Sequence, residues 1–253
     1  MKRQVLFGVA VAVFLWTLVT QAPASLVYRW IGPHMPSLRL FGVDGRLADG
    51  SASGFAIGDR NIDERLGWSL QPWWLPLGRV AAHVTGSGAL QAEGSLQFGL
   101  GGLRLRSLHG SGDAKAIAGL VGYGFAPLAG AAQFDIASLQ LKGNRPLAAE
   151  ADVQLHGLAW ALTQNPVPLG DFRATATTQA DSILVKIVSL SGPLDADGDV
   201  KYTTADGRYE VQLKLKPKDN AEPALKNMLQ SLGAPDSGGA YHLHQDGTLQ
   251  GNL

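Results

Sequence analysis

Apolar and polar residues alternate along most of the chain after Ser37. Leu38 and Leu40 are separated by a polar residue, as are Val211 and Leu213. Because successive side chains of a strand point to opposite faces, this pattern predicts half-buried strands. Glycine turns such as 99–102 separate the strands, and no crossover helices lie between them. The pattern therefore predicts an all-β fold, built as a curled open antiparallel sheet that forms a groove or half-barrel.

Two segments break the alternation and predict short helices. Ala221–Leu232 places Leu225 and Leu229 at helical spacing and has Pro223 in its first turn, as helix starts often do. Asp113–Val121 is rich in alanine and begins with a residue that can cap a helix. We expect the first of these to be the short C-terminal helix of an otherwise β-rich body.

An uncharged, mostly apolar run covers Val5–Thr20 and follows Lys2 and Arg3. As a helix it would be about 24 Å long, somewhat less than the roughly 30 Å hydrocarbon core of a bilayer. Two interpretations are open. Ala22-Pro23-Ala24 fits a signal-peptidase site, whereas Trp16 and the apolar residues that follow the run favour an uncleaved transmembrane anchor.

The anchor interpretation fixes a topology. Positive charges before the run place the N-terminus in the cytoplasm and export everything after Trp30. We therefore expect an N-terminal transmembrane signal-anchor over residues 1–30 and a periplasmic β-rich domain over residues 31–253. No serine-, proline- or charge-rich linker divides the exported part. The predicted location is the inner membrane, with a single pass.

Charge and cysteine content exclude several classes of function. Lys plus Arg number 21 and Asp plus Glu number 21, so the net charge is zero, and no basic stripe predicts a nucleic-acid partner. The chain has no cysteine, which excludes disulfides, thiolate catalysis and zinc sites built on sulfur. Nucleophile elbows, phosphate-binding loops and metalloprotease motifs are absent from the sequence. We expect neither catalysis nor a cofactor.

Asp-Gly pairs predict tight turns. Asp44-Gly45 and Asp49-Gly50 have the chemistry of two-residue hairpin turns. Asp195–Asp199 superficially resembles a calcium loop, but Val200 and Asp206 stand where such a loop needs glycine and a bidentate glutamate. A turn is the favoured interpretation there.

Two histidines near the C-terminus could in principle hold a metal. His242 and His244 are two apart in a predicted edge hairpin over residues 239–249, and would share one face of a strand. A third ligand does not lie nearby in sequence, since the remaining histidines are dispersed. A solvated strand face is therefore predicted in place of a metal site.

An aromatic cluster follows a predicted strand. Trp68 lies in the strand, and Trp73, Trp74 and Leu75 lie between two prolines that prevent helix and central-strand pairing. Two interpretations are open for these four residues. They pack a corner of the core, or they form a docking surface for a protein partner or the membrane interface.

Several motifs carry a family resemblance. They are W-x-L-x-P-x-x-L-P-x-G from Trp68, Gly157-Leu158-Ala159-Trp160, and G-A-Y-x-L followed by G-x-L from Gly239. These residues resemble the type II secretion system protein N family, which is related to the AsmA-like periplasmic proteins. The motifs are spread over most of the chain, and the C-terminal ones are the most specific.

The resemblance implies a non-catalytic component of the type II secretion system that assists export of folded proteins across the outer membrane. Its partners would be other secretion components and the inner membrane, contacted through strand edges or the tryptophan cluster. The AsmA-like kinship implies an alternative. A curled sheet with one apolar face could bind acyl chains as a lipid-binding or lipid-transfer module.

Overall fold

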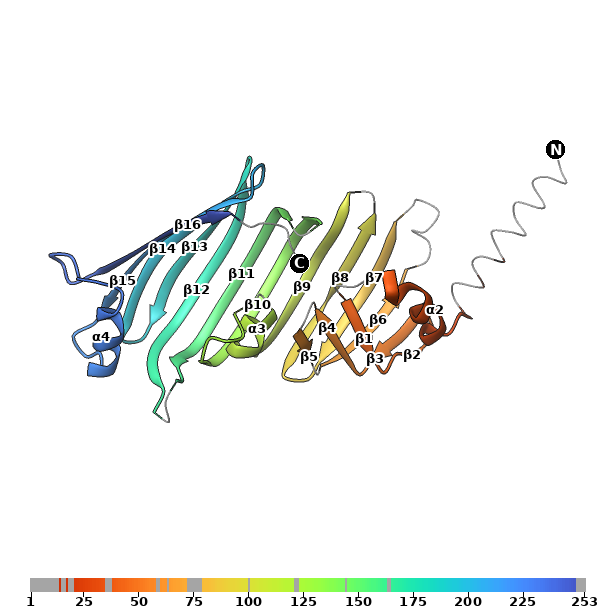
Figure 1. Ribbon diagram of the computed structural model, residues 1–253, viewed down its shortest axis with the longest axis horizontal. Helices are drawn as coiled ribbons and strands as arrows, with labels where there is room; N and C mark the ends of the chain where they lie inside the picture. The colour runs from red at the N-terminus through yellow and green to blue at the C-terminus, as the bar shows by residue number, and fades with distance from the viewer. Residues whose placement is uncertain are drawn as a thin grey trace. The chain divides into compact units, whose positions relative to one another are not determined.

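The computed structural model of the chain describes residues 14, 17, 21–34, 38–57, 60–62, 64–71, 79–99, 101–120, 123–143, 145–162 and 165–248. Their contacts form two compact units, unit 1 within Met1–Leu103 and unit 2 within Arg104–Asn252. Figure 1 labels the strands and helices of each unit. The predicted division of the chain into residues 1–30 and 31–253 stays a prediction.

Unit 1 is built on antiparallel strands. Five strands pair in the order β8-β7-β6-β3-β2, and three more form a small sheet in the order β1-β4-β5. The strands of unit 1 are β1 Leu38–Phe41, β2 Asp44–Gly45, β3 Asp49–Ala52, β4 Gly54–Ile57, β5 Arg60–Ile62, β6 Arg65–Leu70, β7 Val80–Ser87 and β8 Leu90–Gly99. Helix α2 Ala24–Ile31 and the 3-10 turn η1 Gly32–His34 precede them.

The first predicted hairpin forms, but its turn is shifted. Asp44-Gly45 and Asp49-Gly50 lie in β2 and β3, and the turn is closed between them by reciprocal backbone bonds from Arg46 N to Asp49 O (2.8 Å) and back (3.1 Å). Gly45 has φ +84°, where a Cβ would lie 2.8 Å from Asp49 O. Glycine is therefore required beside the turn, and the placement of the turn on the Asp-Gly pairs was wrong.

Unit 2 is one large antiparallel sheet in which the strands follow one another in chain order. Each strand from β10 to β15 pairs antiparallel with the next, and β9 lies beside β10. The strands are β9 Gly102–Asp113, β10 Leu128–Lys142, β11 Arg145–Trp160, β12 Val167–Gln179, β13 Ser182–Ser191, β14 Leu194–Thr203, β15 Arg208–Pro217 and β16 Tyr241–Thr248. The prediction of an all-β, open antiparallel sheet is confirmed.

Two helices interrupt the strands of unit 2, where the sequence predicted them. Helix α3 covers Ala114–Leu120 and α4 covers Pro223–Gln230. In α4, Pro223 is the first helical residue, so its missing N–H costs nothing there. Both helices lie at the same end of the strands, the lower end in Figure 1, because α3 follows β9 and α4 follows β15, which run in the same direction in the antiparallel sheet.

The C-terminal hairpin prediction was wrong. Residues 241–248 form the single strand β16, which pairs with β15, and α4 lies between the two strands in the chain. The glycines at 239 and 247 suggested a turn on each side of a short hairpin. Pairing with β15 instead satisfies the backbone groups on one side of β16 along its whole length.

Of the predicted membrane anchor over residues 1–30, the structure describes Phe14, Thr17 and residues 21–30, so most of its apolar run Val5–Thr20 lies outside the described residues. Within the part of the chain that the structure describes, none of the helices has the length and hydropathy that crossing a bilayer requires.

Candidate functional site

The predicted docking residues are only partly described. Trp68 lies on β6, half-buried, and its indole Nε1 donates a hydrogen bond to the carbonyl of Leu47 at 3.1 Å. Its ring lies against Gly50 on β3, where a Cβ would be 2.6 Å from ring atom Cζ2. Trp68 therefore packs across the β3–β6 pair. Trp73, Trp74 and Leu75 lie outside the described residues, and their docking role stays a prediction.

The sheet of unit 2 has an apolar face and a polar face. One cross-strand row on the apolar face consists of Phe134, Val153, Ala174, Ile187, Gly198, Leu213 and Leu243. The adjacent row on the other face consists of Asp135, Asp152, Thr175, Lys186, Asp199, Gln212 and His244. Residues directly opposite in an antiparallel pair share a face, so the alternation continues in register across seven strands.

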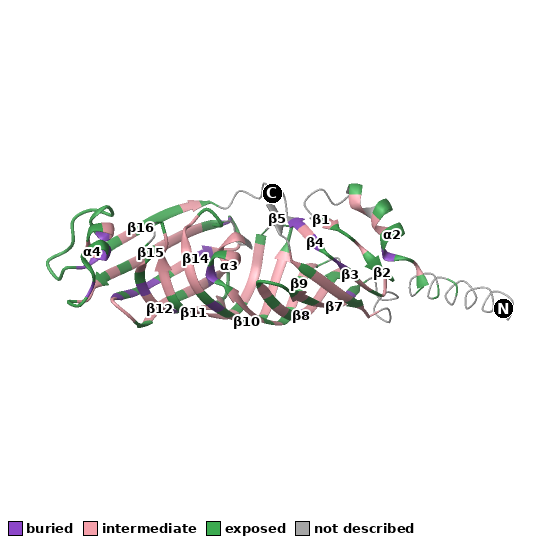
Figure 2. Cartoon of the chain, turned by 90° about the horizontal axis from the view of Figure 1, so that it is seen from below, coloured by how far each residue is buried: buried purple, intermediate pink, exposed green. Residues whose placement is uncertain are grey.

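Helix α4 covers one end of the apolar face. Leu225 and Leu229 are fully buried and belong to a core cluster with Phe172, Leu194 and Tyr241. The buried residues around α4 are visible in Figure 2. Away from α4, the apolar row is mostly half-buried. The apolar face is thus filled by side chains at one end and only partly covered elsewhere.

A polar atom is buried on the apolar face. Tyr202 on β14 is 6% exposed, and its hydroxyl is buried without a hydrogen-bond partner among the described residues. The register places Tyr202 between Ile183 and Tyr209, at the end of β14 farther from α4. An unsatisfied buried hydroxyl costs about 1–3 kcal/mol. A ligand that brings an acceptor to it would remove that cost.

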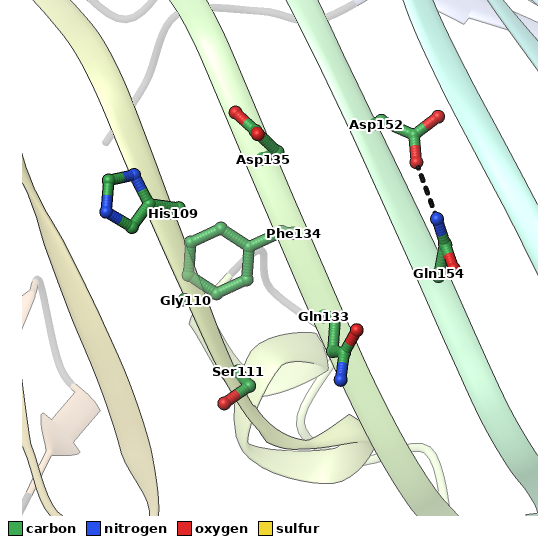
Figure 3. Close-up of a pocket in the computed structure, with 8 residues that line it drawn as sticks. All are labelled: His109, Gly110, Ser111, Gln133, Phe134, Asp135, Asp152 and Gln154. Carbon is green, nitrogen blue, oxygen red and sulfur yellow. Dashed lines mark hydrogen bonds between the residues drawn. The ribbon is translucent and has the colours of Figure 1, made fainter.

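A shallow hollow lies on the polar face between β9, β10 and β11 (Figure 3), with a volume of about 350 Å³. Its lining side chains include His109, Gln133 and Gln154. Asp135 and Asp152 lie directly opposite each other in the β10–β11 register. Two carboxylates in such positions repel each other, so at least one requires a compensating partner.

Arg173 supplies that compensation. Its Nε donates to Asp152 Oδ2 at 2.6 Å, and Thr175 Oγ1 and Gln154 Nε2 also donate to this carboxylate. Burial acts to raise the pKa of Asp152, but these hydrogen bonds and the charge of Arg173 together hold the pKa below its usual value. Asp152 is therefore a structural ion-pair partner. Sequence reasoning missed this pair, because its two residues come from strands whose register the alternation does not reveal.

The predicted turn at Asp195–Asp199 was wrong, since these residues lie inside β14. The three aspartates are exposed, and the small residues between them face the buried side. Lys218 Nζ forms an ion pair with Asp195 Oδ1 at 3.1 Å, and Asp197 lies opposite Lys214 on β15. Aspartate can occupy the solvent-exposed positions of a strand, so the Asp-Gly pair at 197–198 does not form a turn here.

The histidine pair has other partners. His242 Nε2 lies 2.8 Å from Asp236 Oδ2, and His244 Nδ1 lies 4.0 Å from Glu210 Oε1. The pKa of Asp236 is lowered to about 2 by the hydrogen bond with His242 and by the backbone N–H groups of Ala240 and Gly238. Both histidines are exposed, as predicted for a solvated face. Within the described ranges, no three His, Asp or Glu residues are grouped so that they could hold a metal ion.

Comparison with known proteins gives one match. The model of a family described as type II secretion system (T2SS), protein N, matches residues 36–244, which is most of the chain. Neither the curated proteins nor the solved structures contain a match. The family match spans both units, from β1 to the first half of β16, and includes the two tryptophan motifs and the motif Gly239-Ala240-Tyr241-His242-Leu243. The chain therefore belongs to the type II secretion system protein N family.

Proposed function

We propose that this component of the type II secretion system is anchored in the inner membrane, places its β-rich part in the periplasm, and assists export of folded proteins without catalysis. The observation that carries the proposal is the family match over residues 36–244. The uncharged run Val5–Thr20 behind Lys2 and Arg3 supports the anchor and its direction.

The proposed mode of action is protein–protein contact. Strand β16 pairs with β15 along one side and is the last strand of its sheet. A sheet edge offers backbone donors and acceptors to an extended segment of a partner, which is how strand addition works. Trp73, Trp74 and Leu75 are the second candidate contact, on the sequence argument given above. Other components of the secretion system are the proposed partners.

Deletion of the gene tests the role. Release of secreted proteins into the medium should fall, and delivery of the same proteins to the periplasm should continue. Unchanged release would contradict the proposal. Reporter fusions at Leu253 test the topology independently, because a periplasm-active reporter should be active there and a cytoplasm-active one should be silent.

A specific observation favours a second candidate, a lipid-binding or lipid-transfer module. The apolar face of unit 2 is half-buried beyond α4, and the Tyr202 hydroxyl is buried there with no hydrogen-bond partner in the part of the chain that the structure describes. In this proposal the sheet curls into a groove that holds acyl chains, with Tyr202 donating to a polar group of the lipid.

Mass spectrometry of the purified full-length chain tests the lipid candidate. Lipid should co-purify in a defined ratio, and Ala174→Trp, which adds bulk at the centre of the apolar row, should lower that ratio. Ala205→Trp is the control, because Ala205 is exposed in the turn between β14 and β15. Equal lipid content in all three proteins would remove this candidate.

A further inference from the structure

The large hydrophobic side chains that unit 2 exposes gather at one end of its sheet. Among the described residues of unit 2, five such side chains are between 45% and 82% exposed, namely Tyr123, Phe125, Leu162, Leu190 and Leu232. All five lie before β10, after β11, near the end of β13 or after α4. These positions share one end of the antiparallel strands, which we call the apolar end.

The connections at the apolar end are held to one another. Ala161 N donates to Pro127 O at 2.6 Å, which joins the segment before β10 to the one after β11. The rings of Tyr123 and Phe125 lie 6.0 Å apart, tilted by 50°. The exposed rings therefore sit on connections anchored by the sheet, so their exposure is a feature of the fold.

The sequence around these connections is uncharged over unusual lengths. Nineteen residues separate Lys115 from Asp135, and eighteen separate Asp152 from Asp171, without a single Asp, Glu, Lys or Arg. The opposite end of the same strands differs. Its short turns carry Lys142, Arg145, Asp181, Asp206 and Arg208, all exposed. We call this opposite end the charged end. Among the connections at the apolar end, charged residues are confined to α3, which has Lys115, and to the segment between β15 and β16, which has Lys218, Asp219, Glu222, Lys226 and Asp236.

We propose that the apolar end of unit 2 inserts into the surface of a lipid bilayer. The apolar side chains protrude from several separate connections, which suits penetration of the headgroup region, whereas a protein hot spot is a packed patch within a polar rim. Tyr and Phe are typical of the membrane interface. The hollow described above lies on the polar face of the strands.

The charges at this end are of both signs, since Lys218, Asp219 and Asp236 lie in the same connection as α4. Helices α3 and α4, which lie at the apolar end, each carry one lysine, Lys115 and Lys226, and no acidic residue. Asp113 and Glu222 precede the two helices. Because the signs are mixed, the proposed contact rests on the apolar side chains. This contact is distinct from the proposed N-terminal anchor, because it uses residues of unit 2 alone.

Labelling of single cysteines tests the proposal, since the chain has none of its own. Full-length Phe125→Cys, Leu162→Cys and Ala205→Cys would each carry an environment-sensitive fluorophore in vesicles of phosphatidylethanolamine and phosphatidylglycerol. Ala205 is the control because it is exposed at the charged end. The labels at 125 and 162 should be quenched by brominated lipids and lie roughly 5–10 Å into the headgroup and acyl boundary. The label at 205 should be quenched only by aqueous iodide.

Two outcomes would overturn the proposal. Quenching by iodide at all three positions would show that the apolar end stays in water. Protection from both quenchers at 125 and 162 would show that a protein, either a partner or a second copy, covers it. Retention of the chain on carbonate-washed vesicles reports separately on the N-terminal anchor, so failure of the anchor and failure of this contact can be told apart.

Function provides a second readout. Phe125→Ser and Leu162→Ser combined should lower secretion of exported proteins in cells that contain normal amounts of the variant. Phe98→Ser is a matched control, because Phe98 is 63% exposed on β8 in unit 1. Equal secretion by the double variant and the control would contradict a role for the apolar end.

Discussion

The two ends of the unit 2 sheet differ in how they close the strands. At the charged end, strands are joined by tight turns such as those at 179–182 and 203–208, whose polar residues Asp181, Asp206 and Arg208 are exposed. At the apolar end, the connections include α3, α4 and longer segments, and a buried cluster forms beneath α4. The same strands thus end once in solvated turns and once in packed structure that includes the buried cluster.

The largest expected effect concerns the packing of α4. Leu225→Ala removes a fully buried side chain from the cluster and should lower the free energy of unfolding by about 2–5 kcal/mol. Leu232→Ala, just beyond the same helix at 45% exposure, should change it by less than about 0.5 kcal/mol. Chemical denaturation followed by tryptophan fluorescence is the measurement, since Trp160 packs against the cluster. Equal losses for both variants would show that α4 is not docked as described.

One glycine at each end allows the backbone strain of the two ends to be compared. Gly192, between β13 and β14 at the apolar end, has φ +109°, and a Cβ there would overlap the backbone of Gly170. Gly192→Ala should therefore cost about 2 kcal/mol or more. Gly143 at the charged end has φ +60° and open space around it, so Gly143→Ala should cost only about 1 kcal/mol. The same denaturation experiment measures both, and the reverse order would contradict the register of β12 and β13.

Acid should affect the two ends differently. Asp236, before β16, has a pKa lowered to about 2, first by His242 and then by backbone N–H groups. A lowered native pKa stabilises the fold above the unfolded value near 3.8, and this contribution is lost as pH falls toward 2. Asp236→Asn should lower the melting temperature at pH 5 and reduce its fall between pH 4 and pH 2. Asp206→Asn at the charged end is the control, and an identical pH profile for both variants would contradict this assignment.

The smallest expected effect on stability belongs to the exposed residues of the apolar end. Leu162→Ser changes a side chain that is 72% exposed, so the unfolding free energy should move by less than about 0.5 kcal/mol. Thermal unfolding of the purified variant checks this. A loss as large as that of Leu225→Ala would mean that Leu162 packs against the protein and is not available to a membrane.

The alternation of apolar and polar residues predicted the strands well, because each strand has one solvent-exposed face and one buried face. Val211 and Leu213 on β15 face the apolar side, and Lys214 and Lys216 face solvent, as their spacing indicated. The helix near Leu225 was predicted equally well, from the helical spacing of its apolar residues and from Pro223 in its first turn. Turns were predicted less well. At Asp195–Asp199, local Asp-Gly chemistry competed with strand alternation, and pairing on both sides of β14 prevailed.

The candidate sites were less accessible to sequence reasoning. Asp152 and Arg173 are 21 positions apart, and only the β11–β12 pairing makes them neighbours. The burial of the Tyr202 hydroxyl, which has no hydrogen-bond partner within the described ranges, depends on which face of β14 is buried and on what lies above it. The exposed aromatics before β10 could have been suspected from the long uncharged segment around them. Their gathering with Leu162 and Leu190 follows only from the strand order.

The sequence by itself determined the class of fold, the two-faced character of its strands and the family, because these depend on residue types and on a period of two that each strand carries alone. Tertiary structure decided the cross-strand rows, the position of α4 on the apolar face and the division of unit 2 into a charged and an apolar end. The physical reason is that strand register and helix docking depend on contacts between residues far apart in the chain. No local stretch of sequence therefore specifies them.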